Sequence, residues 1–255
     1  MGKHPSIVLG LYSGSYNCNW HTPNVLSLAW TLFESESYGG YLWATSCRVD
    51  SNRNYLINDF LTKTTGDYLF IIDEDMIHPP QMPVLLADRD LPIVSGLYFK
   101  RDEHGLHFPQ FYKFVKEAPD ERRGHGTAVN NLYRVMADEV TKVFMEWGDV
   151  PKTNGPLVVS DKDGVPVTDG LLEIDGGGFG CLMMRRDVLE ALEPPYLITE
   201  PGLNGDLVFY KRAKAAGFKI YGDCRVIAAH MQMTPIGAAA FTDVSWNFVQ
   251  GRLDV

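Results

Sequence analysis

The sequence predicts an α/β fold: one domain built on a doubly wound, mostly parallel sheet. Strand-like and helix-like segments alternate through the first hundred residues, as in a parallel sheet with helical crossovers. The run from Tyr68 to Ile72 is apolar throughout, which is typical of a strand covered on both faces. The chain has 255 residues, 45% of them hydrophobic, enough for one large domain with a sizeable core.

Hydrophobic periodicity and turn residues define the individual elements. The first half is predicted to contain strands at 6–11, 41–46, 68–72 and 93–99, a helix that begins at Thr22-Pro23 and is broken by Gly39-Gly40, and helices at 54–64 and 80–87. The second half is predicted to contain strands at 171–174, up to Met184, at 218–221 and at 225–230, a glycine-rich turn at 176–180, and helices at 187–192 and 206–216. Turn signals in the middle of the chain indicate an elaboration of the same domain.

Composition excludes several classes of protein. The net charge of -9 argues against a broad nucleic-acid-binding surface, although a local basic groove remains compatible with it. No apolar stretch of about 18 residues indicates a membrane span, and the N-terminus lacks the features of a signal peptide. The cysteines, Cys18, Cys47, Cys181 and Cys224, have no metal-ligand spacing, so we interpret them as reduced thiols of a cytoplasmic protein.

The stretch Asp73-Glu74-Asp75 directly follows the buried strand, at the edge where such sheets bind ligands. Side chains alternate along an extended chain, so Asp73 and Asp75 are expected to face the same way. Neighbouring carboxylates repel each other unless a cation lies between them, and a hard divalent cation binds such oxygens while keeping positions for phosphates. The alternative is a solvated acidic loop, because Asp-x-Asp is common by chance.

Four further features have both a structural and a functional interpretation. His230 ends an apolar run, and it is either a packed histidine or a third metal ligand. Asp206 begins a predicted helix, and it is either a capping residue or a general base. Arg53 is either an exposed residue near a helix start or a bidentate phosphate contact. The run Gly176 to Gly180 is either a plain turn or a place where backbone approaches a ligand.

Taken in order, these stretches resemble the GT-A fold glycosyltransferases. The stretches that carry the resemblance are Asn52-Arg53-Asn54, the run 66–76 (GDYLFIIDEDM), the run 93–101 (IVSGLYFKR), the glycine-containing run 176–190 (GGGFGCLMMRRDVLE), the run 204–221 (NGDLVFYKRAKAAGFKIY) and His230. The resemblance covers most of the chain from Ile7 to His230, apart from the middle insertion.

The resemblance implies a metal-dependent glycosyltransferase that uses a nucleotide sugar, most often a UDP-sugar, together with Mn²⁺ or Mg²⁺. The implied site comprises Asp73, Asp75 and His230 at the metal, Tyr12, Ser13, Asp50, Arg53 and Asp73 at the donor, Gly177, Gly178 and Phe179 on the acceptor side, and Asp206 as catalytic base. It also implies a nucleotide-sugar-binding half at 1–115, an insertion at 116–169, an acceptor half at 170–235 and a tail at 236–255. Asp206 matches the catalytic aspartate of inverting members, which favours inverting chemistry. Gly205 stands where the family usually has an acidic residue, and this departure leaves retaining chemistry open.

The acceptor and two competing functions remain open, as does the oligomeric state. The compact layout also looks like glycosyltransferases of bacteriophages, whose acceptors include hydroxymethylated DNA bases, glycans and proteins. Lys100-Arg101, Arg122-Arg123 and the aromatic stretch 108–114 would line a DNA groove, or form an ordinary surface and core. A nucleotidyltransferase usually has a glycine-rich basic first loop, and the loop here lacks Lys and Arg. A sugar-nucleotide-binding protein without its base would explain Gly205.

Overall fold

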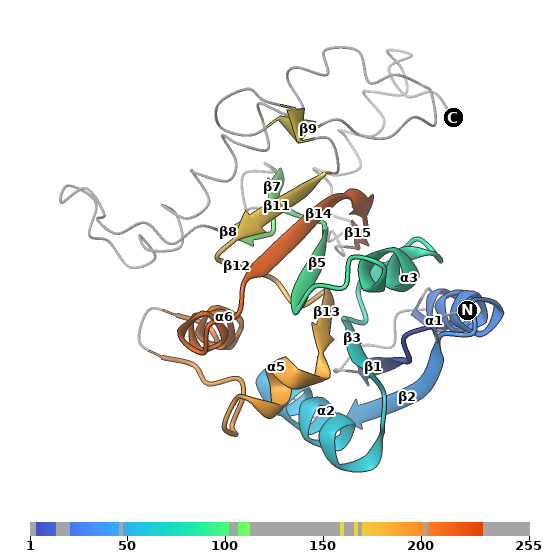
Figure 1. Ribbon diagram of the computed structural model, residues 1–255, viewed down its shortest axis with the longest axis horizontal. Helices are drawn as coiled ribbons and strands as arrows, with labels where there is room; N and C mark the ends of the chain where they lie inside the picture. The colour runs from blue at the N-terminus through green and yellow to red at the C-terminus, as the bar shows by residue number, and fades with distance from the viewer. Residues whose placement is uncertain are drawn as a thin grey trace, which may run out of the picture.

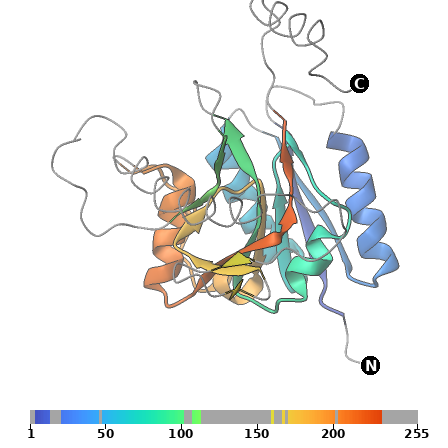
Figure 2. The same ribbon diagram turned by 90° about the horizontal axis from the view of Figure 1, so that it is seen from above.

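The computed structural model describes residues 4–13, 21–45, 48–101, 107–112, 159–160, 166–167, 170–200 and 203–231. Within these ranges one mixed sheet is covered by helices on both faces (Figures 1 and 2). This confirms the predicted α/β fold with a mostly parallel sheet. Most of the expected insertion at 116–169 and the tail at 236–255 lie outside the described residues.

The main sheet has seven strands in the order β11-β14-β5-β13-β3-β1-β2. These strands are β1 (Ile7–Ser13), β2 (Tyr38–Thr45), β3 (Tyr68–Ile72), β5 (Ile93–Leu97), β11 (Leu171–Ile174), β13 (Cys181–Arg185) and β14 (Ile220–Ile227). Strand β13 runs antiparallel between β3 and β5, and β11 runs antiparallel to β14. The other strands are parallel, so their carboxyl ends meet at one edge.

Short two-stranded pairs extend this framework beyond the main sheet. They are β4 (Met76–Ile77) with β15 (Ala229–His230), β6 (Phe99–Arg101) with β7 (His107–Pro109), β8 (Phe111–Tyr112) with β12 (Gly176–Gly177), and β9 (Val159–Ser160) with β10 (Pro166–Val167). The β4–β15 pair matters most for the site, because it aligns His230 with Met76, directly after Asp75.

The helices bury two separate cores, one on each face of the sheet. They are α1 (His21–Glu34), α2 (Val49–Lys63), α3 (Met82–Ala87), α5 (Arg186–Glu190) and α6 (Gly205–Ala215). Helices α1 and α3 pack Leu28, Leu32 and Leu86 against one face. Helices α2 and α6 pack Phe60 and Phe209 against the other. Figure 2 shows α1, in blue, and α6, in orange, on opposite sides of the strands.

Three element boundaries differ from those expected. Helix α2 begins at Val49 rather than at 54, because its first turns bury the polar side chains of Asn52 and Arg53, which hydrophobic periodicity does not detect. Gly39 and Gly40 lie inside β2, where a Cβ on Gly39 would come within 2.9 Å of the Ile7 carbonyl oxygen. The two strands expected after α6 are one strand, β14, followed by the short β15.

None of the helices that the structure describes combines the length and apolarity needed to cross a membrane. Two of the four cysteines, Cys181 and Cys224, lie within the described ranges, and both are buried and free. Burial raises the pKa of each thiol to about 12, so both stay protonated at neutral pH.

Candidate functional site at the carboxyl edge of the sheet

Chemically active side chains converge at the carboxyl edge of the parallel strands. Tyr12 lies near the end of β1, Asp73 directly follows β3, and His230 lies in β15 just beyond β14. The first turns of α2 and α6 bring Arg53 and Asp206 to the same place, since the Arg53 guanidinium contacts both Asp73 and Asp206. Ligands of open α/β sheets bind at this edge.

Arg53 is the centre of the cluster. Its Nη2 donates to both carboxylate oxygens of Asp73 at 3.0 and 2.9 Å, and its Nη1 donates to Asp206 Oδ1 at 2.5 Å. Its guanidinium lies 4.8 Å from the ring centre of Phe179 and 5.7 Å from that of Tyr12. Burial opposes the charged form, but Asp206 and Asp73 outweigh it and raise the pKa of Arg53. The arginine is therefore a charged residue that joins two acids 133 positions apart in the sequence.

The acidic stretch forms a turn rather than an extended segment. The Met76 N–H donates to the Asp73 carbonyl at 3.2 Å, and the residues between β3 and β4 have no strand conformation. The expected alternation of side chains therefore does not apply here, because it requires extended backbone. The turn directs the two aspartates to different partners, Asp73 to Arg53 and Asp75 to His230.

Asp75 and His230 form a pair across 155 positions of sequence. His230 Nε2 lies 3.0 Å from Asp75 Oδ2, and the Met231 N–H donates to the Asp75 carbonyl at 2.7 Å. The Tyr98 ring meets the His230 ring edge-on at 5.9 Å between centres. The hydrogen bond to Asp75 raises the pKa of His230 despite partial burial. The pair therefore presents one carboxylate and one imidazole side by side.

Asp206 occupies the first turn of α6, as expected from the sequence. Asn204 caps this helix by accepting from the Leu207 N–H at 3.0 Å, which fixes the orientation of the turn. Burial raises the pKa of Asp206 to about 6; Asp73 and Asp50 add to the rise, and Arg53 opposes it. A carboxyl group with this pKa is ionised at neutral pH yet retains more basicity than an ordinary aspartate.

Asp50 lies beside Gly205, in the first turn of α2. Its Oδ2 accepts a hydrogen bond from the Thr199 hydroxyl at 3.0 Å. A Cβ built on Gly205 would lie 2.7 Å from Asp50 Oδ1 and 2.9 Å from its Cγ. The space that a side chain at position 205 would need is therefore filled by the Asp50 carboxylate, next to Asp206.

Gly205→Ala should lower the free energy of unfolding by about 1–3 kcal/mol, the usual cost of overpacking, because the new methyl group displaces Asp50. Chemical denaturation measures the change. In an Asp50→Ala background the same substitution should cost much less, since the clash is gone. Equal costs in the two backgrounds would show that Asp50 does not determine which residue fits at 205.

The remaining expected residues are placed as follows. Tyr12 is buried, and burial followed by Asp73 raises the pKa of its hydroxyl group. Ser13 ends β1, and its side chain lies outside the described residues.

The residues expected on the acceptor side are all buried. Gly177 and Gly178 are buried, and the Gly178 N–H donates to the Gln110 carbonyl at 3.2 Å. Phe179 has no exposed surface and packs against Arg53, Phe209 and Tyr210, so its contacts are with the protein interior.

Within the described residues no three His, Cys, Asp or Glu side chains gather closely enough to form a complete metal cluster. The structure brings two of the three expected ligands together, Asp75 and His230, and leaves Asp73 on Arg53. Divalent cations often take only one or two carboxylates from a protein and complete their coordination with substrate phosphates and water.

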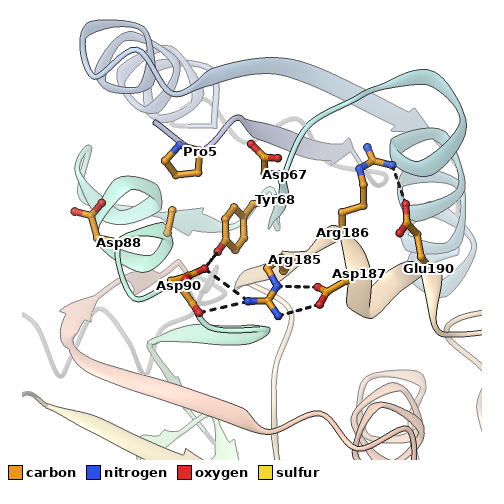
Figure 3. Close-up of a pocket in the computed structure, with 10 residues that line it drawn as sticks. Pro5, Asp67, Tyr68, Asp88, Asp90, Arg185, Arg186, Asp187 and Glu190 are labelled. Atoms are coloured by element: carbon orange, nitrogen blue, oxygen red, sulfur yellow. Dashed lines mark hydrogen bonds and ion pairs between the residues drawn. The ribbon is translucent and has the colours of Figure 1, made fainter. Parts of the chain in front are cut away.

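A surface hollow of about 600 Å³ lies at the opposite edge of the sheet, at the start of β3 and the end of β13 (Figure 3). Its arginines are already paired: Arg185 contacts Asp90 and Asp187, and Arg186 contacts Glu190. It contains none of the side chains that converge at the carboxyl edge.

Sequence reasoning missed two residues of the carboxyl edge, His21 and Tyr98. His21 is the first residue of α1 and is 6% exposed, and Tyr98 is buried between Gly180 and His230. Tyr98 lies inside an apolar run that indicates only core packing. The available signal for His21 was its position directly before Thr22-Pro23, where the sequence predicts a helix start.

No protein-family model and no curated protein sequence matches the chain. Among solved structures, A197 from STIV is similar, with a TM-score of 0.50 and 16% identity over 89% of this chain and 86% of that chain. Glucosyl-3-phosphoglycerate synthase from Mycobacterium tuberculosis, solved with Mg²⁺ and uridine diphosphate, gives a TM-score of 0.45 and 13% identity over 98% of this chain and 81% of that chain. CMP:2-keto-3-deoxy-manno-octonic acid synthetase, solved with CTP, gives a TM-score of 0.42 and 13% identity over 96% of this chain and 98% of that chain. The first similarity concerns the fold alone.

Proposed function

We propose that this protein is a metal-dependent glycosyltransferase that transfers a sugar from a nucleotide sugar, most simply a UDP-sugar, to an acceptor hydroxyl. One observation carries the proposal: three separate segments bring Asp73 and Asp75, His230, and Asp206 to the carboxyl edge of the sheet, and Arg53 joins two of these acids. Such an edge binds phosphorylated ligands, and an acid whose pKa is raised, as that of Asp206 is, suits proton transfer.

The side chains at Asp75 and His230 fit a divalent cation such as Mn²⁺ or Mg²⁺. A carboxylate oxygen and an imidazole nitrogen 3.0 Å apart are ligand types that Mn²⁺ accepts, and two protein ligands leave positions for diphosphate oxygens. Asp73 is held by Arg53 through both carboxylate oxygens, and each of these oxygens keeps a further lone pair for a ligand. A bound cation would supply positive charge beside the departing diphosphate.

Asp206 is the proposed general base. Its pKa of about 6 keeps it ionised at neutral pH, ready to remove the proton from the acceptor hydroxyl as that oxygen attacks the anomeric carbon. Arg53 holds the carboxylate through Oδ1 and so fixes its direction. Attack assisted by a base in this way inverts the anomeric centre, which NMR of the product would detect.

Gly205 does not favour a protein that has lost its catalytic base. The Asp50 carboxylate occupies the space beside Gly205, so the glycine has a packing reason and an acid still accompanies Asp206. The nucleotidyltransferase alternative differs in its products: glycosyl transfer from a UDP-sugar releases uridine diphosphate, whereas nucleotidyl transfer from a nucleoside triphosphate releases pyrophosphate.

The deciding experiment incubates the protein with a panel of nucleotide sugars, with Mn²⁺ or with a chelator, and measures release of nucleoside diphosphate. The acceptor arms are DNA with hydroxymethylated bases, glycans and proteins, analysed by mass spectrometry. Of the residues expected to line a DNA groove, Arg122-Arg123 and part of 108–114 lie outside the described residues. The assay with hydroxymethylated DNA therefore tests DNA as acceptor without depending on the position of these residues. Pyrophosphate release without diphosphate release would contradict the proposal.

Asp75→Asn should weaken Mn²⁺-dependent binding of uridine diphosphate by about 100-fold or more, because a metal bridge is worth several kcal/mol. Isothermal titration calorimetry with Mn²⁺ or chelator measures the change. Asp88→Asn, an exposed acid of the opposite edge, is the matched control and should bind like the wild type. Unchanged binding by Asp75→Asn would remove the metal assignment.

A further inference from the structure

His21 is a buried imidazole without a hydrogen-bond partner in the described part of the chain. Both ring nitrogens are buried and neither has a partner there, although the residue is only 6% exposed. A buried polar group left unsatisfied costs free energy. His78, the other buried histidine nearby, contrasts with it: its nitrogens contact the Asn24 side chain at 3.0 Å and the Gly180 carbonyl at 2.7 Å.

Helix α1 fixes the position of His21 at the carboxyl edge. His21, Asn24, Leu28 and Leu32 are the buried residues of α1, and their spacing forms one stripe that faces the sheet. Asn24 donates to the His78 carbonyl at 2.9 Å and accepts from the His78 N–H at 3.3 Å. The first turn of α1 is therefore attached three residues beyond Asp75.

His21 is a neutral hydrogen-bond donor at the amino end of a helix. The Trp43 ring meets the imidazole edge-on at 6.3 Å between centres, on the β2 side. Burial lowers the pKa of His21, against the opposite effect of Asp73 and Asp75, so the ring is neutral and keeps one N–H to donate. The amino end of a helix adds free backbone N–H groups and a positive partial charge, which attract phosphate.

We propose that His21 binds a phosphate group of the nucleoside diphosphate, its imidazole N–H donating to a phosphate oxygen beside the first turn of α1. This assignment rests on the proposed function and adds a phosphate contact from α1, on the face of the sheet opposite α2 and α6. It also explains why an unsatisfied imidazole is buried: the free protein bears a cost that the ligand removes.

The test compares wild type, His21→Leu and His21→Gln for binding of uridine diphosphate with Mn²⁺ by calorimetry, of uridine alone by ligand-observed NMR, and of Mn²⁺ alone. His21→Leu should weaken uridine diphosphate binding about 10- to 100-fold, as for a lost hydrogen bond to a charged group, and leave uridine and Mn²⁺ binding unchanged. His21→Gln, which keeps an N–H donor, should recover most of the affinity. Thr22→Ala, exposed on the same turn, is the control and should bind normally.

Thermal stability separates this role from a structural one. His21→Leu should melt at the same or a higher temperature than the wild type, because leucine removes an unsatisfied polar group. His78→Leu should melt lower, because it removes the side-chain hydrogen bonds that His78 makes to Asn24 and to the Gly180 carbonyl. A drop in His21→Leu like that of His78→Leu would overturn the assignment.

Three binding results would also overturn it: unchanged uridine diphosphate affinity in His21→Leu, an equal loss for uridine, or weakened binding of Mn²⁺ alone. If the wild type bound no uridine diphosphate with Mn²⁺, the proposed function would fail, and the phosphate assignment with it. If the wild type bound uridine diphosphate and His21→Leu bound it equally well, only the phosphate assignment would be overturned.

Discussion

Arg53→Met should lower the free energy of unfolding by about 3–5 kcal/mol, the range found when one partner of a buried ion pair is removed. The Arg53 side chain is 6% exposed and those of Asp73 and Asp206 are 17% and 18% exposed, so the substitution leaves two carboxylates facing each other with little solvent. Thermal unfolding should shift down by roughly 10 °C for a chain of this size. Denaturant titration gives the free energy directly.

Arg185→Met is the matched control for this substitution. Arg185 pairs with Asp187, and their side chains are 33% and 51% exposed, so the loss should stay below about 1 kcal/mol, as for surface pairs. Arg53→Lys should recover only part of the stability, because an ammonium group cannot contact both acids through a planar fork. A loss of less than about 1 kcal/mol in Arg53→Met would show that the two acids do not depend on the arginine.

Asp206→Asn should reduce sugar transfer by about 100- to 10,000-fold, the contribution of a positioned general base, while uridine diphosphate binding with Mn²⁺ stays within a few-fold of wild type. Asparagine keeps the shape of the side chain but cannot take up the proton. Initial rates with saturating donor and a donor titration by calorimetry separate the two effects. Asp187→Asn, an exposed acid outside the site, should retain full activity.

The pH dependence of transfer provides a second measurement on Asp206. Its pKa is raised to about 6, mainly by burial, and the base must be ionised to act. The value of kcat/KM should therefore fall about tenfold per pH unit below pH 6 and level off above it. A wild-type profile that stays flat from pH 5 to 7, or an Asp206→Asn variant with full activity, would remove Asp206 as the base.

The strands and the edge of the sheet were predictable because their signals are local. The apolar run from Tyr68 to Ile72 was typical of a covered strand, so the acidic residues after it were expected at its carboxyl end. The helix expected at 206–216 was found as α6 (Gly205–Ala215) for the same reason. The predicted start of α2 was wrong because the first turns of this helix bury polar residues.

The pairings within the site were not predictable, because each depends on how distant elements pack. Arg53 reaches Asp206 only because α2 and α6 bring their first turns together, and Asp50 fills the space beside Gly205 for the same reason. Asp75 meets His230 because β15 pairs with β4. A sequence pattern gives the face on which a side chain lies, not its partner across more than a hundred residues.

By itself, the sequence determined the α/β class, the strand that presents Asp73 and Asp75, and the helix start that carries Asp206. These depend on backbone periodicity and capping, which act over a few residues. Only the tertiary structure decided that Arg53 contacts two carboxylates, that Asp50 accompanies Asp206, and that His21 is buried with no hydrogen-bond partner among the described residues. The physical reason is that a buried charge or polar group has whichever partner the packing of separate elements brings within hydrogen-bond distance.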